Sequence, residues 1–243
     1  MGLFSSVLHV RDTTRELLLP AMDSILRDAR YLRAATLPVP AEGPFALTDH
    51  DASVSAGPYY LVSPQQGRWL TIVETHFALR GVPPLSEIGS RLSATLSCYA
   101  LTLVVHDDDV LFYNLDRDGK SLDGYNSYPQ YFEQARLSDA EIAEQRHSPE
   151  AFQALLPAHR SLDELRSLLN RGWWNAYDSG NLDENGVATD EGDSFVFEGE
   201  RMTALGTLLQ LHGNEEEYPY SAWGESQSIR WPEFIALRYK KQP

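Results

Sequence analysis

Residues 100–125 read ALTLVVHDDDVLFYNLDRDGKSLDGY and contain the strongest strand and turn signals of the chain. Apolar and β-branched residues fill 100–106 and 110–115, and a third strand is predicted over 121–125. The connections between these strands are His106-Asp107-Asp108-Asp109 and Asp116-Arg117-Asp118-Gly119, and their Asp and Gly residues favour tight hairpin turns. The stretch therefore predicts three consecutive antiparallel strands.

Working outward toward the N-terminus, the pattern predicts alternating strands and helices. A strand over 3–10 precedes a Thr13/Glu16 capping box, and helical spacing continues to about Arg33. After a Pro- and Gly-rich loop over 36–58, two strands (59–62 and 68–74) form a hairpin, and a helix follows over 85–97. This order indicates an α+β fold, with helices packed on one face of a mostly antiparallel sheet.

Beyond residue 132 the sequence becomes helical and acidic. Capping boxes at Ser138/Glu141 and Ser161/Glu164, with Pro149 between them, predict helices over 139–146, 149–156 and 162–171. A polar loop over 178–192, a helix over 200–211 and an irregular, aromatic tail complete the chain. We expect residues 1–132 and 133–243 to pack as one unit, since the aromatic tail needs the sheet to bury it.

The charge of the chain is concentrated in its C-terminal part. The net charge is −15, yet residues 1–100 hold nine acidic and eight basic residues, whereas 178–233 hold thirteen acidic and two basic ones. Such a field repels nucleic acid and anionic membranes and attracts basic surfaces. Cys98 is the only cysteine, which excludes an intrachain disulfide, and no apolar stretch is long enough to span a membrane. We expect a cytoplasmic protein.

Sequence motifs for catalysis or metal binding are not convincing. Residues 106–109 could supply metal ligands, but neighbouring side chains at a strand end point to opposite faces, so a solvated turn is favoured. Residues 114–125 and 181–192 each match part of a calcium-binding loop, and neither has the required Glu at the twelfth position. The seven histidines are scattered, and no nucleophile or phosphate-loop motif is present. We expect no enzymatic activity, no metal and no cofactor.

Two resemblances bear on function. The segments HDDDVL (106–111), Asp118-Gly119 and YNSYPQYF (125–132) resemble an uncharacterised bacterial family whose members read HDSDVL, DG and YNS-P-YF. From this resemblance we expect the segment to have a structural role, with Asn126 and Ser127 bonding nearby backbone and Tyr131 and Phe132 plugging the sheet. The whole chain also resembles the immunity proteins of bacterial secreted nuclease toxins, particularly those of type VI secretion, which are acidic cytoplasmic proteins without catalytic activity.

Together these observations predict an immunity (antitoxin-like) protein that binds a basic nuclease toxin and neutralises it by occlusion. Acidic side chains would steer the toxin, and tryptophans would anchor it. The predicted partner-binding residues are Asp107, Asp108, Asp109, Trp173, Trp174, Asp183, Glu184, Asp190, Glu191, Glu215, Glu216, Glu217 and Trp223. The alternatives are a calcium- or carbohydrate-binding module or a hydrolase that uses the 178–193 loop with the Trp173-Trp174 pair, and an acidic scaffold domain.

Overall fold

A single antiparallel sheet organises the chain. The computed structural model describes residues 5–38, 57–74, 81–129, 131–132, 137–138, 140–141, 149–171, 198–211 and 233–242. Eight strands of these residues form a sheet of order β2-β8-β3-β4-β1-β5-β6-β7, in which all neighbours are antiparallel. The strands are β1 (Ser5–Arg11), β2 (Tyr31–Pro38), β3 (Tyr59–Val62), β4 (Trp69–Glu74), β5 (Tyr99–His106), β6 (Val110–Arg117), β7 (Lys120–Asn126) and β8 (Ile235–Lys241). The predicted α+β class is confirmed.

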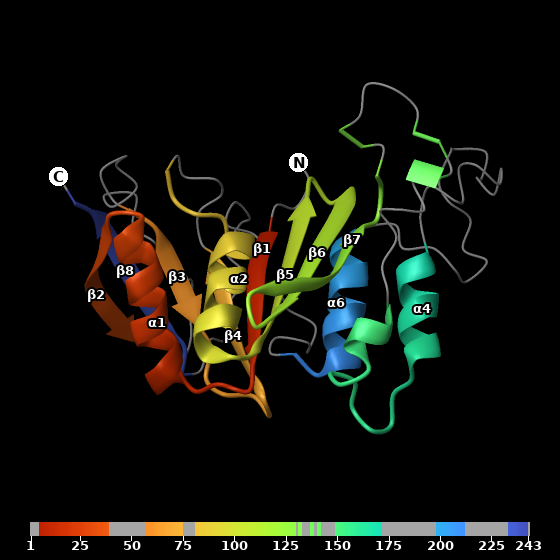
Figure 1. The fold of residues 1–243 in the computed structure, drawn as a ribbon, viewed down its shortest axis with the longest axis horizontal. Helices are drawn as coiled ribbons and strands as arrows, with labels where there is room; N and C mark the ends of the chain where they lie inside the picture. The colour runs from red at the N-terminus through yellow and green to blue at the C-terminus, as the bar shows by residue number, and fades with distance from the viewer. Residues whose placement is uncertain are drawn as a thin grey trace.

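Helices cover both faces of this sheet. The helices α1 (Arg15–Asp28) and α2 (Leu85–Leu96) lie on one face, side by side in front of the sheet in Figure 1. On the other face, at the β5–β7 end, lie the 3₁₀ turn η2 (Pro149–Phe152) and the helices α4 (Leu162–Asn170) and α6 (Glu198–Leu209). The C-terminal helical region therefore encloses a second core. None of the helices in the described part of the chain is long and apolar enough to cross a membrane.

The prediction of three consecutive antiparallel strands within residues 100–125 is confirmed. Strands β5, β6 and β7 pair in order, through the predicted turns. In the second turn Asp118 and Gly119 have φ of 51° and 73°, the left-handed conformation that Asp tolerates and Gly adopts freely. The N–H of Gly119 also donates to Ser93 Oγ at 2.9 Å, so this hairpin is attached to α2.

The predicted first helix is too long. Helix α1 ends at Asp28, and Tyr31–Pro38 is the strand β2, where helical spacing and a loop had been predicted. Arg30, with φ of 66°, turns the chain out of the helix, and β2 then pairs with β8. The predicted Thr13 cap is also wrong: the N-cap is Thr14, and its side chain makes no capping hydrogen bond.

The C-terminal tail is not irregular throughout, because Ile235–Lys241 is the strand β8. It lies between β2 and β3, inside the sheet built by the N-terminal half. Tyr239 is fully buried and packs edge-on against Tyr60, with ring centroids 5.9 Å apart. Local sequence signals do not reveal this pairing, since its partners lie about 180–200 residues away in the chain.

Three of the predicted helices of the C-terminal region can be compared with the structure. The helix predicted over 200–211 is confirmed as α6 (Glu198–Leu209). The Ser161/Glu164 capping box is confirmed, with both reciprocal hydrogen bonds present at the start of α4. The predicted helix over 149–156 is a 3₁₀ turn limited to Pro149–Phe152. The helix predicted over 139–146 and the loop over 178–192 lie mostly or wholly outside the described residues.

Candidate partner-binding surface

The β5–β6 turn presents three successive carboxylates in a defined conformation. Asp107 and Asp108 have φ of 51° and 63°, and the N–H of Asp109 donates to the carbonyl of His106 at 3.1 Å. Aspartate is one of the few residues besides glycine and asparagine that enters this left-handed region routinely. The same residues therefore supply both the turn and its negative charge.

Asp108 is held by helix α6. The N–H of Glu198 donates to the Asp108 carbonyl at 2.9 Å, and the N–H of Gly199 donates to Asp108 Oδ1 at 3.2 Å. These two donors belong to the first turn of the helix, where backbone N–H groups lack partners within the helix. Burial raises the pKa of Asp108, the Gly199 hydrogen bond opposes this, and the neighbouring carboxylates of Asp109, Glu200 and Asp107 raise the pKa further. Asp108 therefore has a structural role, whereas the sequence predicted only that its charge would attract a partner.

A buried ion pair fixes α6 beneath the turn. Arg201 Nε donates to Glu198 Oε2 at 2.8 Å, and Arg201 Nη1 donates to the carbonyls of Leu168 and Leu169 at 3.0 and 3.1 Å. Both charged side chains are almost completely shielded from solvent. Burial raises the pKa of Glu198, and the charge of Arg201 acts in the opposite direction. The pair joins the start of α6 to the end of α4.

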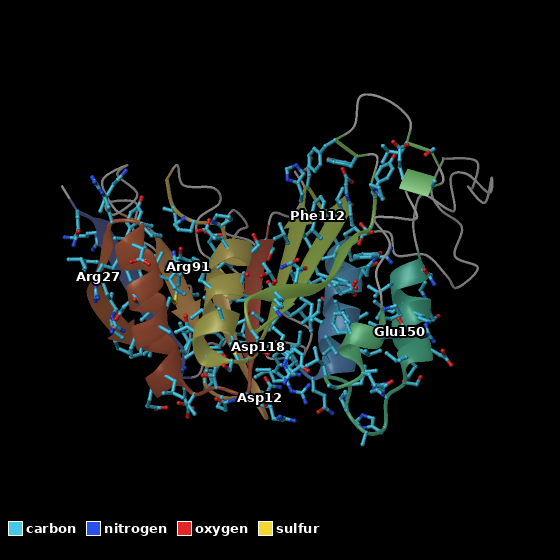
Figure 2. The ribbon with its side chains drawn as sticks, in the orientation of Figure 1. Asp12, Arg27, Arg91, Phe112, Asp118 and Glu150 are labelled. Carbon is cyan, nitrogen blue, oxygen red and sulfur yellow. The ribbon has the colours of Figure 1, made fainter. Side chains whose placement is uncertain are left out.

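Beside the turn lies a cluster of aromatic rings. The Phe132 ring stacks on Phe112 at 6.1 Å and meets His106 and Tyr131 edge-on at 5.0 and 4.8 Å. Phe132 is 59% exposed, so it does not plug the sheet as the family resemblance implied. Figure 2 places Phe112 at one end of the sheet, opposite the end that carries Asp12 and Asp118.

The aromatic rings and the carboxylates form one surface. The hydroxyl of Tyr131 donates to Asp109 Oδ2 at 3.0 Å, and this bond raises the pKa of Tyr131. We call this surface the acidic–aromatic patch, defined as His106, Asp107, Asp108, Asp109, Phe112, Tyr131 and Phe132. Its charge was predicted from the sequence, but its rings were missed. One sequence signal could have predicted the rings. His106 lies two residues after Val104 in β5, and Phe112 of β6 is paired with Val104, so the three side chains project from the same face of the sheet.

Several predicted details of this region can be compared with the structure. Ser127 Oγ accepts from the N–H of Leu111 at 2.9 Å, and Asn126 Oδ1 accepts from the N–H of Tyr128 at 3.0 Å, so their predicted backbone bonds are confirmed. Cys98, which directly precedes β5 at the other end of the sheet, is buried, and burial raises the pKa of its thiol to about 12, so the thiol stays protonated at neutral pH.

The structure describes three of the thirteen predicted partner-binding residues. The structure brings Asp107, Asp108 and Asp109 together, whereas the others lie outside the described residues, namely Trp173, Trp174, Asp183, Glu184, Asp190, Glu191, Glu215, Glu216, Glu217 and Trp223. The 178–193 loop of the alternative functions lies there too. Within the described ranges, no group of three or more His, Cys, Asp or Glu side chains is arranged to hold a metal ion.

Neither a protein family model nor a curated protein nor a solved structure matches this chain.

Proposed function

We propose that this protein acts by binding a basic protein partner, and that the partner is a bacterial nuclease toxin that it neutralises by occlusion. The observation that carries the proposal is the acidic–aromatic patch, in which Tyr131 donates to Asp109 of the acidic turn and packs against the exposed Phe132. The net charge of −15 supports the same class of partner. The proposal that the partner is a nuclease toxin rests on the resemblance of the whole chain to the immunity proteins of secreted nuclease toxins.

The patch has the composition of a protein-binding surface. Aromatic rings at the centre of an interface contribute most of the binding energy, because they bury a large area with little loss of conformational entropy. Phe132 is stacked on Phe112, so its ring is ordered before a partner arrives. Its face and the adjacent carboxylates suit a lysine or arginine side chain, which can contact a ring and a carboxylate together.

The mechanism requires no chemical step by this protein. A nuclease surface that grips phosphates is basic, and the carboxylates of Asp107 and Asp109 would occupy the place of those phosphates. Long-range attraction would raise the association rate, and burial of Phe132 would slow dissociation. Because Asp108 is bonded to the first turn of α6, the turn would present its charges without reorganisation.

The experiment measures binding to the products of the genes that directly flank this one, by interferometry between 50 and 300 mM NaCl, and we expect one of them to be basic and to bind. Asp107→Asn/Asp109→Asn should slow association about tenfold at low salt, and Phe132→Ala should speed dissociation about tenfold. The matched controls are Asp118→Asn/Asp163→Asn, which removes two exposed carboxylates elsewhere, and Leu17→Ala, which truncates a side chain that is 58% exposed. If patch and control variants bind alike, the patch is not the docking surface. If neither flanking gene product binds, the proposed partner is wrong.

A further inference from the structure

The end of the sheet opposite the acidic–aromatic patch carries a row of arginines and aromatic rings. Trp69, Arg11, Tyr99, Arg117 and Lys120 occupy one rung across β4, β1, β5, β6 and β7, and each residue is paired with the next. Directly paired residues on antiparallel strands project from the same face with their Cβ atoms about 4.5–5.5 Å apart. We call these five residues the arginine row.

Within the row each arginine lies against a ring. The guanidinium carbon of Arg11 is 5.4 Å from the centre of a Trp69 ring, and that of Arg117 is 4.6 Å from the Tyr99 ring centre. Arg117 also donates to the Tyr99 hydroxyl. Stacking on a ring fixes a guanidinium in one plane and leaves its N–H edge available to an oxyanion. The rings therefore orient the two cations in advance of any ligand.

Arg11 is buried and incompletely satisfied. It is 8% exposed, and its Nη1 has no hydrogen-bond partner in the described structure. The carboxylate of Asp12 is 3.9 Å from Arg11 Nε, and the same oxygen accepts from Arg68 Nε at 2.5 Å. Burial and the charge of Arg68 lower the pKa of Arg11, and the Asp12 carboxylate opposes them. A buried donor without a protein partner costs free energy, and an oxyanion acceptor would recover that cost.

The local charge is opposite to that of the chain as a whole. Arg11, Arg68, Arg117 and Lys120 provide four cations, and the two carboxylates paired with them are those of Asp12, 3.9 Å from Arg11, and Asp118, 3.5 Å from Arg117 Nε. Arg68 and Arg117 have side chains 64% and 49% exposed, so an anion in solution can reach them. In a protein of net charge −15, this cluster is a local positive centre.

We infer that the arginine row, with Arg68, is a binding site for the oxyanion of a small ligand, either a phosphate or a carboxylate group. Arg68 and Arg117 make the first contact from solvent, and the Nη1 donor of Arg11 gains the acceptor that it lacks. The planar guanidinium edge suits either oxyanion, since both offer two oxygens side by side. This site is independent of the proposed protein partner and lies at the other end of the sheet.

The test is an NMR titration of the full chain, labelled with ¹⁵N at its arginine side chains, at pH 7. The probes are inorganic phosphate and succinate, at an ionic strength held constant with NaCl. We expect a saturable shift of the Arg11 and Arg68 Nε–H signals with one of the probes or with both, and the probe that saturates identifies the ligand class. Shifts that rise linearly with both anions, as they do with chloride, would overturn the inference.

Variants locate the site. Arg68→Gln/Arg117→Gln should weaken binding at least tenfold, and because both side chains are exposed this variant should fold. The control variant Arg27→Gln/Arg91→Gln removes the same charge from α1 and α2, where Figure 2 shows these two residues. It should bind the anion as the parent does. Equal weakening in both pairs would show a general charge effect and refute the site. Arg11→Met alters the buried part of the site and is informative only if it folds. The test of the site therefore relies on Arg68→Gln/Arg117→Gln.

Discussion

Glu198 and Arg201 form an ion pair with 2.8 Å between Oε2 and Nε, inside the core and out of contact with solvent. Removing one member leaves the other charge buried without compensation, which costs about 3–5 kcal/mol of unfolding free energy. We expect that loss for Arg201→Met and for Glu198→Gln. The double variant Glu198→Gln/Arg201→Met should lose clearly less than the sum, because no charge remains buried. Urea unfolding of the four proteins gives the coupling, and additive losses would show that the pair is not an energetic unit.

Asp108 should contribute to stability through its bonds to α6. Asp108→Ala removes the acceptor of the Gly199 N–H and places alanine at φ of 63°, so it should cost about 1–2 kcal/mol, whereas Asp108→Asn retains an oxygen and tolerates this φ and should cost less. Chemical unfolding measures both. Asp108→Ala and Asp108→Asn also remove the same charge, so an equal effect of the two substitutions would indicate that charge, and not capping, is responsible.

Gly119 should be less tolerant of substitution than Gly67. Both have positive φ, of 73° and 56°, so Gly→Ala carries a backbone cost of about 1 kcal/mol at each. At Gly119 the added Cβ would also lie 2.8 Å from Ala94 Cβ, whereas at Gly67 it meets nothing within 4 Å. Thermal unfolding should therefore show a larger loss for Gly119→Ala. Equal losses would mean that α2 moves away freely.

Burial of Asp116 predicts a pH-dependent stability. Asp116 is 2% exposed; burial raises its pKa, and the bond from Asn114 only partly opposes this. A raised carboxyl pKa means that the contribution of Asp116 to stability is full below its unfolded pKa, about 4, and is lost as the pH rises through the folded value.

Asp116→Asn should therefore be more stable than the parent at pH 7, and the difference should disappear toward pH 4. Denaturant unfolding between pH 4 and 8 tests this. Asp163→Asn, whose side chain is 88% exposed, controls for the change in net charge and should show no such gain. A difference in stability between Asp116→Asn and the parent that does not change with pH would contradict a raised pKa of Asp116.

The two halves of the chain should unfold together. Strand β8 completes the sheet between β2 and β3, and Tyr239 donates to Asp23 Oδ1 of α1 at 2.9 Å. Arg15 at the start of α1 also donates to the carbonyl of Glu233, at 2.6 Å. A chain truncated after residue 232 should therefore lose its cooperative thermal transition, and the full chain should show a single one. Two separated transitions in the full chain would contradict this expectation.

Local residue patterns are sufficient to predict the elements whose hydrogen bonds join residues close in the chain. The β5–β6–β7 strands alternate with turns rich in Asp and Gly, and the Ser161/Glu164 box marks the start of α4, because hydrogen bonds between residues three or four apart are encoded by those residues. The three carboxylates at 107–109 were predicted as a solvated turn for the same reason.

The remaining strands and the environments of the site residues depend on contacts between distant parts of the chain. The strands Tyr31–Pro38 and Ile235–Lys241 form because they pair with each other across 200 residues, and no local propensity encodes such a contact. Asp108 became the cap of α6, and Arg11 came to lie between Trp69 and Tyr99, through strand register and helix packing. The type of each residue was visible in the sequence, but its neighbours depended on which strands met, and those neighbours set its burial, charge environment and role.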